Sequence, residues 1–371
     1  MFKINIKEKL TNSKWIPFLK LKMELNKYKR LIDTREQSGD NLDYSGWKNW
    51  NTHTNKIDLL KPLKNELLTV HKVNSYITNA WTKFYEILIK YPQLTDTKDG
   101  IVHSFHICEA PGAFIYALFD YTVKQKLKLD WCAQTLNPYS EHNKKYFPSM
   151  LHDSFGLIKG CPDQWLFGKD NTGNIMNIKN IKYYGETITG IKLMTADGGL
   201  QSSPHLYNEQ EAHVSKLIYA EVLTILTVLD KGGSAVIKMF IPIAEPITIS
   251  ILFLLSCCFI NIKICKPMTS HASNSEIYII CMNYKKPKLN MYRLFRLLNN
   301  KPDWSRIPLY PLDLIPTEFL ESLYEIAKKL VNLQIRVINR SLVYHELCIP
   351  KNIDKYKKLT VDRWLKNNLF I

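Results

Sequence analysis

Glycine and paired cysteine motifs are scarce in this chain. Only 14 of its 371 residues are glycine, and the stretch SFHICEAPGAFIYALF, residues 104–119, which reads as a strand running into a helix, holds a single one, Gly112. A loop that cradles a dinucleotide normally carries three. The eight cysteines form no C-x-x-C pair and no zinc-like spacing with histidine. We therefore expect no dinucleotide loop and no metal site, and we interpret the cysteines as reduced, buried thiols.

Long apolar runs are also missing. The longest, ITISILFLLSCCFI at residues 247–260, is shorter than the roughly 20 residues that span a membrane, and it is typical of a buried helix. Lysines interrupt the first residues, where a secretory signal would need an unbroken apolar core. We expect an intracellular protein without a membrane anchor.

Acidic residues are outnumbered. The 50 lysines and arginines against 34 aspartates and glutamates give a formal net charge of +16 and a pI of about 9.3. Such a chain should attract a polyanion, with nucleic acid the leading candidate. A generally basic surface without a specific partner is the alternative that charge alone leaves open.

The middle of the chain has the pattern of one large α/β core. From Phe105 onward, apolar runs alternate with longer amphipathic stretches, which is typical of a mostly parallel sheet covered by helices. We predict strands at 104–110, 129–136, 191–196 and 234–240, helices at 75–92, 112–126 and 208–231, and an edge hairpin of 261–267 with 275–284. Residues 140–190 are rich in turn formers and predict a third strand region with long ligand-side loops.

The two ends differ from this core. Residues 1–55 are basic and aromatic without a clear hydrophobic period, so we treat them as an extension. Residues 286–371 have helical signals and a basic finish. We predict a central domain at 56–285 between a basic amino-terminal and a mainly helical, basic carboxy-terminal extension.

Candidate chemistry lies where predicted strands end, because ligands of open α/β sheets bind outside the carboxyl ends of the strands. Glu109 and Asp197 end strands, although an N-cap or turn role is as common for such carboxylates as a ligand contact. Lys238 interrupts the apolar run SAVIKMF, and burying an ammonium is costly without a partner or a lowered pKa. It is either a functional amine between Asp197 and Glu276 or a side chain that reaches solvent at the strand's end.

A second lysine, Lys83, could lower the pKa of Lys238 if it lay nearby. Lys83 sits on the predicted helix 75–92, off the stripe of apolar residues that recur at helical spacing. Periodicity alone therefore favours a solvated surface charge for Lys83.

Four motifs in order, CEAPGAF, TADGG, GGSAVIKMF and KPMTSHASNSEIY, resemble the FtsJ-type RNA ribose 2′-O-methyltransferase superfamily with its lysine, aspartate, lysine, glutamate tetrad. More narrowly, NAWTKFYEI, CEAPGAFIYAL, WCAQTLNPY, FGKDNTGNIM and NSEIYIICMNY resemble the Adrift-type cap-specific mRNA methyltransferases, particularly the branch that modifies the second transcribed nucleotide. The resemblance covers about residues 72–284. It includes neither terminal extension.

The resemblance implies a Rossmann-like, S-adenosylmethionine-dependent methyltransferase fold: a mostly parallel seven-stranded sheet with an antiparallel edge hairpin and helices on both faces. The tetrad then falls on Lys83, Asp197, Lys238 and Glu276. S-adenosylmethionine contacts are implied at Gly112, Pro111, Trp131, Asp197 and, facing the adenine, Asp170. The usual acidic residue at the end of the second strand is replaced by TLNP, so that Asn137 or a backbone group would hold the donor's ribose.

The implied reaction suits these residue types. A ribose 2′-hydroxyl is a weak acid, so methyl transfer needs a base and in-line placement of two reactants, without a metal. We expect Lys238 to be the base, with its pKa lowered by burial and by Lys83. Asp197 and Glu276 would orient the two amines.

The implied substrate is capped mRNA, methylated at the first or second transcribed nucleotide, with other capping or transcription factors as further partners. Three tryptophans are candidates for stacking on the cap guanine: Trp47, Trp50 and Trp304. A core or surface role is the alternative for each of them. A ribosomal or other RNA 2′-O-methyltransferase and a catalytically inactive RNA-binding or stimulatory subunit are the alternatives. An adenine amino-methyltransferase is disfavoured because LNPY follows the second strand, not the fourth. Richness in lysine, asparagine and isoleucine suggests an AT-rich genome such as that of a large DNA virus.

Overall fold

The computed structural model describes residues 14–36, 52–54, 56–69, 76–146, 153–200, 208–271, 273–299, 304–347 and 349–368. These residues contain a seven-stranded sheet in the order β3-β2-β1-β4-β5-β7-β6. The strands are β1 (Ile101–Ile107), β2 (Lys128–Gln134), β3 (Trp165–Leu166), β4 (Leu193–Ala196), β5 (Ser234–Phe240), β6 (Phe259–Cys265) and β7 (Glu276–Tyr284). Neighbours among the first five pair in parallel, whereas β7 runs antiparallel to both β5 and β6. The predicted mostly parallel sheet with an antiparallel edge hairpin is confirmed.

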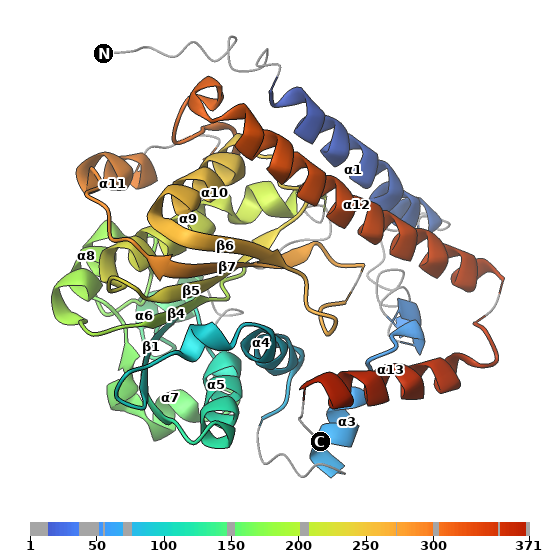
Figure 1. Cartoon of the computed structure of the whole chain (residues 1–371), viewed down its shortest axis with the longest axis horizontal. Coiled ribbons are helices and arrows are strands. Elements are labelled where there is room, and N and C mark those ends of the chain that lie inside the picture. The colour runs from blue at the N-terminus through green and yellow to red at the C-terminus, as the bar shows by residue number, and fades with distance from the viewer. Residues whose placement is uncertain are drawn as a thin grey trace.

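Helices cover both faces of the sheet (Figure 1). One face carries α3 (Leu63–Thr69), α4 (Asn79–Lys90), α5 (Ala113–Lys124) and α13 (Ile353–Asn368). The other carries α8 (Ile178–Thr187), α9 (Gln210–Val228), α10 (Pro246–Cys258) and α11 (Met291–Asn299). The short helices α6 (Glu141–Tyr146) and α7 (Leu157–Gly160) lie in the connections after β2. No helix within the described ranges is both long and apolar enough to cross a membrane.

The central strands are apolar because both of their faces are buried. Along β5, Ala235, Ile237 and Met239 pack in the core beneath α9 and α10, while Val236 points to the α4 and α5 side. A strand covered on both sides reads as a continuous apolar run. Lys238 is the one charged residue in it.

The predicted helix at 247–260 is two residues too long. α10 ends at Cys258, and β6 begins directly at Phe259, which pairs with Tyr284. The apolar run continues across this boundary because Cys258 and Phe259 are both buried, whereas Ile260 is exposed.

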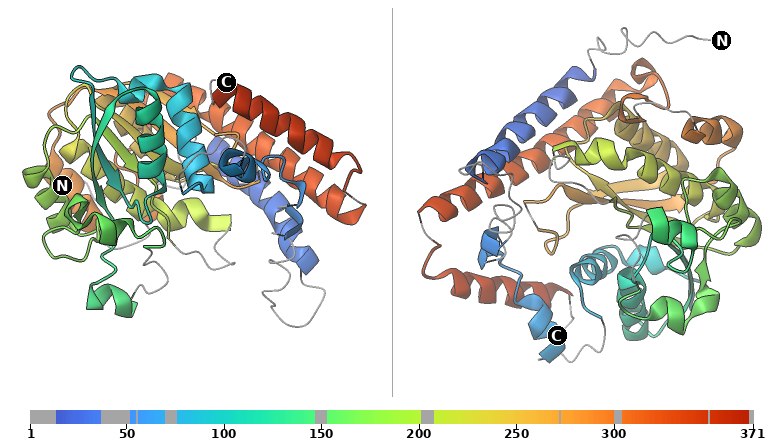
Figure 2. Two further views of the ribbon diagram at one scale, coloured as in Figure 1. Left: turned by 90° about the horizontal axis from the view of Figure 1, so that it is seen from below. Right: turned by 180° about the vertical axis from the view of Figure 1, so that it is seen from behind.

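The terminal segments pack against the core (Figure 2). Helix α1 (Ile16–Glu36) lies along the long helix α12 (Thr317–Glu346), and the rings of Phe18 and Tyr324 meet edge to face at 5.6 Å. We predicted no element within residues 1–55, since no hydrophobic period is visible there, and α1 forms against a partner distant in sequence. The predicted division at residues 55 and 285 stays a prediction.

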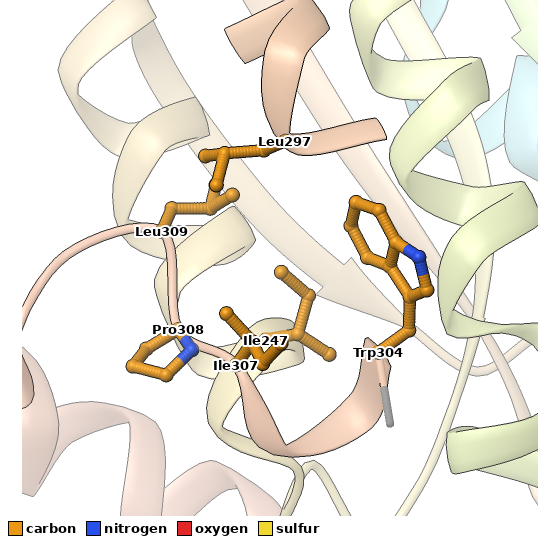
Figure 3. Close-up of a pocket in the computed structure, with 6 residues that line it drawn as sticks. All are labelled: Ile247, Leu297, Trp304, Ile307, Pro308 and Leu309. Atoms are coloured by element: carbon orange, nitrogen blue, oxygen red, sulfur yellow. The ribbon is translucent and has the colours of Figure 1, made fainter. Parts of the chain in front are cut away.

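Trp304 has a core role. The centroid of its ring lies 5.4 Å from that of Tyr219, a residue of α9. It lines a cavity of about 20 Å³ together with apolar side chains that include Ile247 and Leu309 (Figure 3). That volume holds about one water molecule and no nucleobase. Trp47 and Trp50 lie outside the described residues.

Candidate active site

The turn between β1 and α5 requires its glycine. Gly112 has φ +111°, in the region that L side chains rarely adopt, and a Cβ there would lie 2.5 Å from Cδ2 of Leu157. The preceding Ala110–Pro111 bond is cis. Leu157 therefore packs against this turn, which lies at the carboxyl end of β1, where the sequence predicted a donor-binding loop.

Glu109 caps the helix that follows this turn. Its Oε1 accepts hydrogen bonds from the backbone N–H groups of Phe114 (2.7 Å) and Ile115 (3.3 Å). Burial and the nearby Asp197 carboxylate hold the pKa of Glu109 well above its usual range. Of the two roles left open for Glu109, the structure supports the N-terminal cap.

The four tetrad positions meet at the carboxyl ends of β4 and β5. Nζ of Lys83, on α4, lies 2.7 Å from Oε1 of Glu276, the first residue of β7. Nζ of Lys238 lies 3.2 Å from Oδ1 of Asp197 and donates to the Asp197 carbonyl at 2.8 Å. The side chains are 12–19% exposed, so each remains reachable from solvent. Lys83 is therefore ion-paired and mostly buried, and the solvated surface role favoured by periodicity is wrong.

A tyrosine joins the two ion pairs into one network. The hydroxyl of Tyr278 lies 3.1 Å from Oδ1 of Asp197 and 3.1 Å from Oε1 of Glu276. Tyr278 sits on β7 directly across from Lys238 of β5, so both side chains are on the same face of the sheet. Sequence reasoning missed this residue, although its position two residues after Glu276 puts it on the same face.

The pKa of Lys238 differs from the sequence-based expectation. Burial alone would lower the pKa of Lys238, but Asp197, Glu276 and Glu221 outweigh burial, and the pKa is raised. We predicted a lowered pKa with help from Lys83; that is wrong for the protein without ligands, since three carboxylates face this amine. Burial also opposes ionisation of Glu276, yet Lys83 and then Lys238 hold its pKa below its usual value.

A third lysine, Lys266, lies behind Glu276. It is the residue directly after β6, and its Nζ donates to Asn274 O (3.0 Å), Asn274 Oδ1 (2.9 Å) and Glu276 O (2.8 Å). Burial lowers the pKa of Lys266 to about 8. This amine fixes the loop that delivers Glu276, and the only signal for it in the sequence was a lysine ending an apolar strand.

Two other implied donor contacts lie on β2 and in the loop after β3. Trp131 is in the middle of β2, half-buried, with its ring 6.1 Å from that of Trp165. Asp170 organises its own loop by accepting hydrogen bonds from Thr172, Asn177 and Asn180. Partial burial would raise the pKa of Asp170, but these hydrogen bonds outweigh it and the pKa is lowered. Donor contacts by Trp131 and Asp170 stay predictions.

The side chain of Asn137 is also hydrogen-bonded within the loops. Its Nδ2 donates to the Asn171 carbonyl at 2.9 Å, and its Oδ1 accepts from the Tyr139 N–H at 2.9 Å. Asn137 thus ties the segment after β2 to the loop around residue 171, and ribose recognition by its side chain would require exchanging these bonds.

The sheet order, with β7 antiparallel between β5 and β6, and the acidic and lysine side chains at the carboxyl ends of β4 and β5 define a Rossmann-like methyltransferase. Residues 76–284 match the family model described as FtsJ-like methyltransferase. The chain belongs to this family, whose members take the methyl group from S-adenosylmethionine.

The relatives include viral and animal proteins. A protein of Acanthamoeba polyphaga mimivirus is 36% identical over 97% of this chain and 46% of its own length. The cap-specific mRNA (nucleoside-2′-O-)-methyltransferase 2 of Pongo abelii is 36% identical over 90% of this chain and 42% of its own length. A probable methyltransferase of African swine fever virus is 31% identical over 85% of this chain and 76% of its own length. The chain thus spans less than half of the first two relatives.

The residues present fit S-adenosylmethionine. The turn after β1 has a single glycine, Gly112, and the donor has no pyrophosphate that would need further glycines. After β4, a Cβ on Gly199 would lie 3.7 Å from Nζ of Lys238, so this glycine keeps the amine uncovered. Gly112 and Asp197 would hold the donor between these two loops.

Proposed function

We propose that this protein methylates the ribose 2′-oxygen of capped mRNA at the first or second transcribed nucleotide, with Lys238 as general base. The observation that carries the proposal is the connected network of Lys83, Glu276, Tyr278, Asp197 and Lys238. Cap specificity is supported by the relatives of that name, which align over most of this chain.

Bound S-adenosylmethionine would supply an electrophilic methyl group on a positively charged sulfur. Lys238 must be neutral to accept the proton of the 2′-hydroxyl, and in the protein without ligands its pKa is raised chiefly by Asp197. Additional positive charge beside Asp197 would offset that carboxylate and lower the pKa of Lys238. Lys83, held by Glu276, would donate to the ribose oxygen and orient it.

An active enzyme is favoured over an inactive RNA-binding subunit because all four tetrad positions hold the expected residue types and form ion pairs. An unpaired or substituted position would have been expected in a subunit that had lost its chemistry.

The decisive assay measures methyl transfer from labelled donor to capped RNAs that are, or are not, already methylated at the first nucleotide, with nuclease mapping of the product.

We expect Lys238→Ala to lower turnover by about 10²–10⁴-fold, the contribution of a general base. Folding and donor binding should be retained. Lys263→Ala, an exposed lysine on β6, is the matched control. Near-wild-type turnover of Lys238→Ala would refute the assignment.

A further inference from the structure

A basic groove opens beside Lys83. It has a volume of about 630 Å³ and is lined by the segment leading into α3, the first turn of α3, the start of α4, the loop after β6, and α13. This volume is in the range of about 300–1,000 Å³ usual for ligand sites. Three of its lysines, Lys61, Lys64 and Lys357, lie outside residues 76–284, which match the family model.

The described lining has four lysines and one aspartate. Lys83 is paired with Glu276 and Lys357 with Asp354 at 3.1 Å. Oδ1 of Asp58 accepts a hydrogen bond from the Leu60 N–H at 3.0 Å. Neither Lys61 nor Lys64 forms an ion pair with a described residue, and both are exposed. Uncompensated lysines around a cavity attract an anion.

The wall formed by α13 is fixed to α4, the helix that carries Lys83. Trp364 of α13 is fully buried, and its Nε1 donates to Oε2 of Glu86 on α4 at 3.2 Å. Glu86 also accepts from the N–H groups of Met268 (2.7 Å) and Thr269 (3.2 Å). One buried carboxylate thus joins α4, the loop after β6 and the carboxy-terminal helix, so the groove is a built feature next to Lys83.

We propose that this groove binds the phosphates of the RNA chain next to the ribose that is methylated. This inference rests on the proposed function and adds the route that the substrate takes. The described residues that line the groove include no Phe, Tyr or Trp on which a base could stack, whereas lysines bind phosphates as point charges without reading sequence. Lys83 belongs to both groove and network, so phosphates held by Lys61, Lys64 and Lys357 would lead the strand to Lys238.

The test uses the full chain with Lys61→Ala and Lys64→Ala combined. Binding of short fluorescent RNAs is measured by anisotropy over a salt series, with capped, 5′-triphosphate and 5′-hydroxyl RNAs in parallel. Losing two phosphate contacts should weaken binding on the order of tenfold or more and make the slope of log K against log salt less negative by about 1.4. KM for RNA should rise while kcat and donor affinity stay unchanged.

The matched control is Lys128→Ala with Lys231→Ala, two exposed lysines at the amino ends of β2 and β5, opposite the site. Equal RNA affinity and equal salt slope in the two double variants would overturn the inference. A loss confined to capped and triphosphate RNAs would place the 5′ polyphosphate in the groove. A loss shared by 5′-hydroxyl RNA would place internal phosphates there. Failure of the wild-type protein to methylate any RNA would refute the proposed function instead, since binding is measured separately.

Discussion

Tyr278→Phe is the sharpest perturbation of the candidate site, because it removes one hydroxyl from the middle of the network and leaves the ring in place. The hydroxyl lies 3.1 Å from a carboxylate oxygen of Asp197 and of Glu276. Burial, with the two neighbouring carboxylates, holds the pKa of Tyr278 well above its usual range. The group is therefore a permanent donor.

The size of the effect follows from this geometry. The hydroxyl has one proton, so it donates to one carboxylate at a time, and a hydrogen bond to a charged group contributes roughly 1.5–3 kcal/mol. That range corresponds to about 10- to 150-fold in rate if the bond is needed in the transition state. Without the donor, the carboxylates attract Lys238 more strongly, which raises the pKa of that amine further and leaves less of it neutral.

The assay is kcat on capped RNA, with donor affinity and urea denaturation measured in parallel. Tyr284→Phe is the control, because this tyrosine is also buried on β7 and its hydroxyl donates to the Leu226 carbonyl at 3.0 Å, away from the network. Tyr284→Phe should lose about 1 kcal/mol of stability and Tyr278→Phe roughly 1.5–3 kcal/mol. Only Tyr278→Phe should lose turnover, and kcat within twofold of wild type would refute the bridging role.

Two further variants test the turn and the supporting lysine. Gly112→Ala should lower the free energy of unfolding by more than the roughly 1–2 kcal/mol that a side chain costs at such a φ, because its Cβ would also meet Leu157. Gly190→Ala, with φ +80° and open space around it, should lose only the strain cost, and equal losses in calorimetry would contradict the contact with Leu157. The pKa of Lys266 is lowered from 10.5 to about 8, so the folded chain binds fewer protons than the unfolded chain between those values, and this group makes stability rise with pH across that window. Lys266→Met should remove that rise in urea denaturation at pH 7.5, 8.5 and 9.5, and equal pH slopes in both proteins would contradict the assignment.

Local signals were sufficient for the residues that end strands. Asp197 and Lys238 were identified because a carboxylate and an ammonium stand out at the ends of apolar runs, and parallel strands bring those ends to one edge of the sheet. The single-glycine turn was also predicted, since the need for glycine at position 112 is set by local backbone conformation.

Contacts between segments far apart in the chain could not be predicted in the same way. α1 has no clear stripe, because its burial is set by α12, almost 300 residues further on. The pKa of Lys238 was predicted in the wrong direction because it depends on how many carboxylates converge on the amine, and Glu221 comes from α9 on another part of the chain.

The amino-acid sequence by itself determined the alternation of strands and helices, the single-glycine turn at Gly112 and the chemical types at the ends of the central strands, since each depends on neighbours along the chain. Only the tertiary structure decided that Lys83 forms an ion pair with Glu276, that Tyr278 joins the two ion pairs, and that α3 and α13 line a groove beside them. These depend on distances between segments far apart in sequence, which hydrophobic periodicity does not encode.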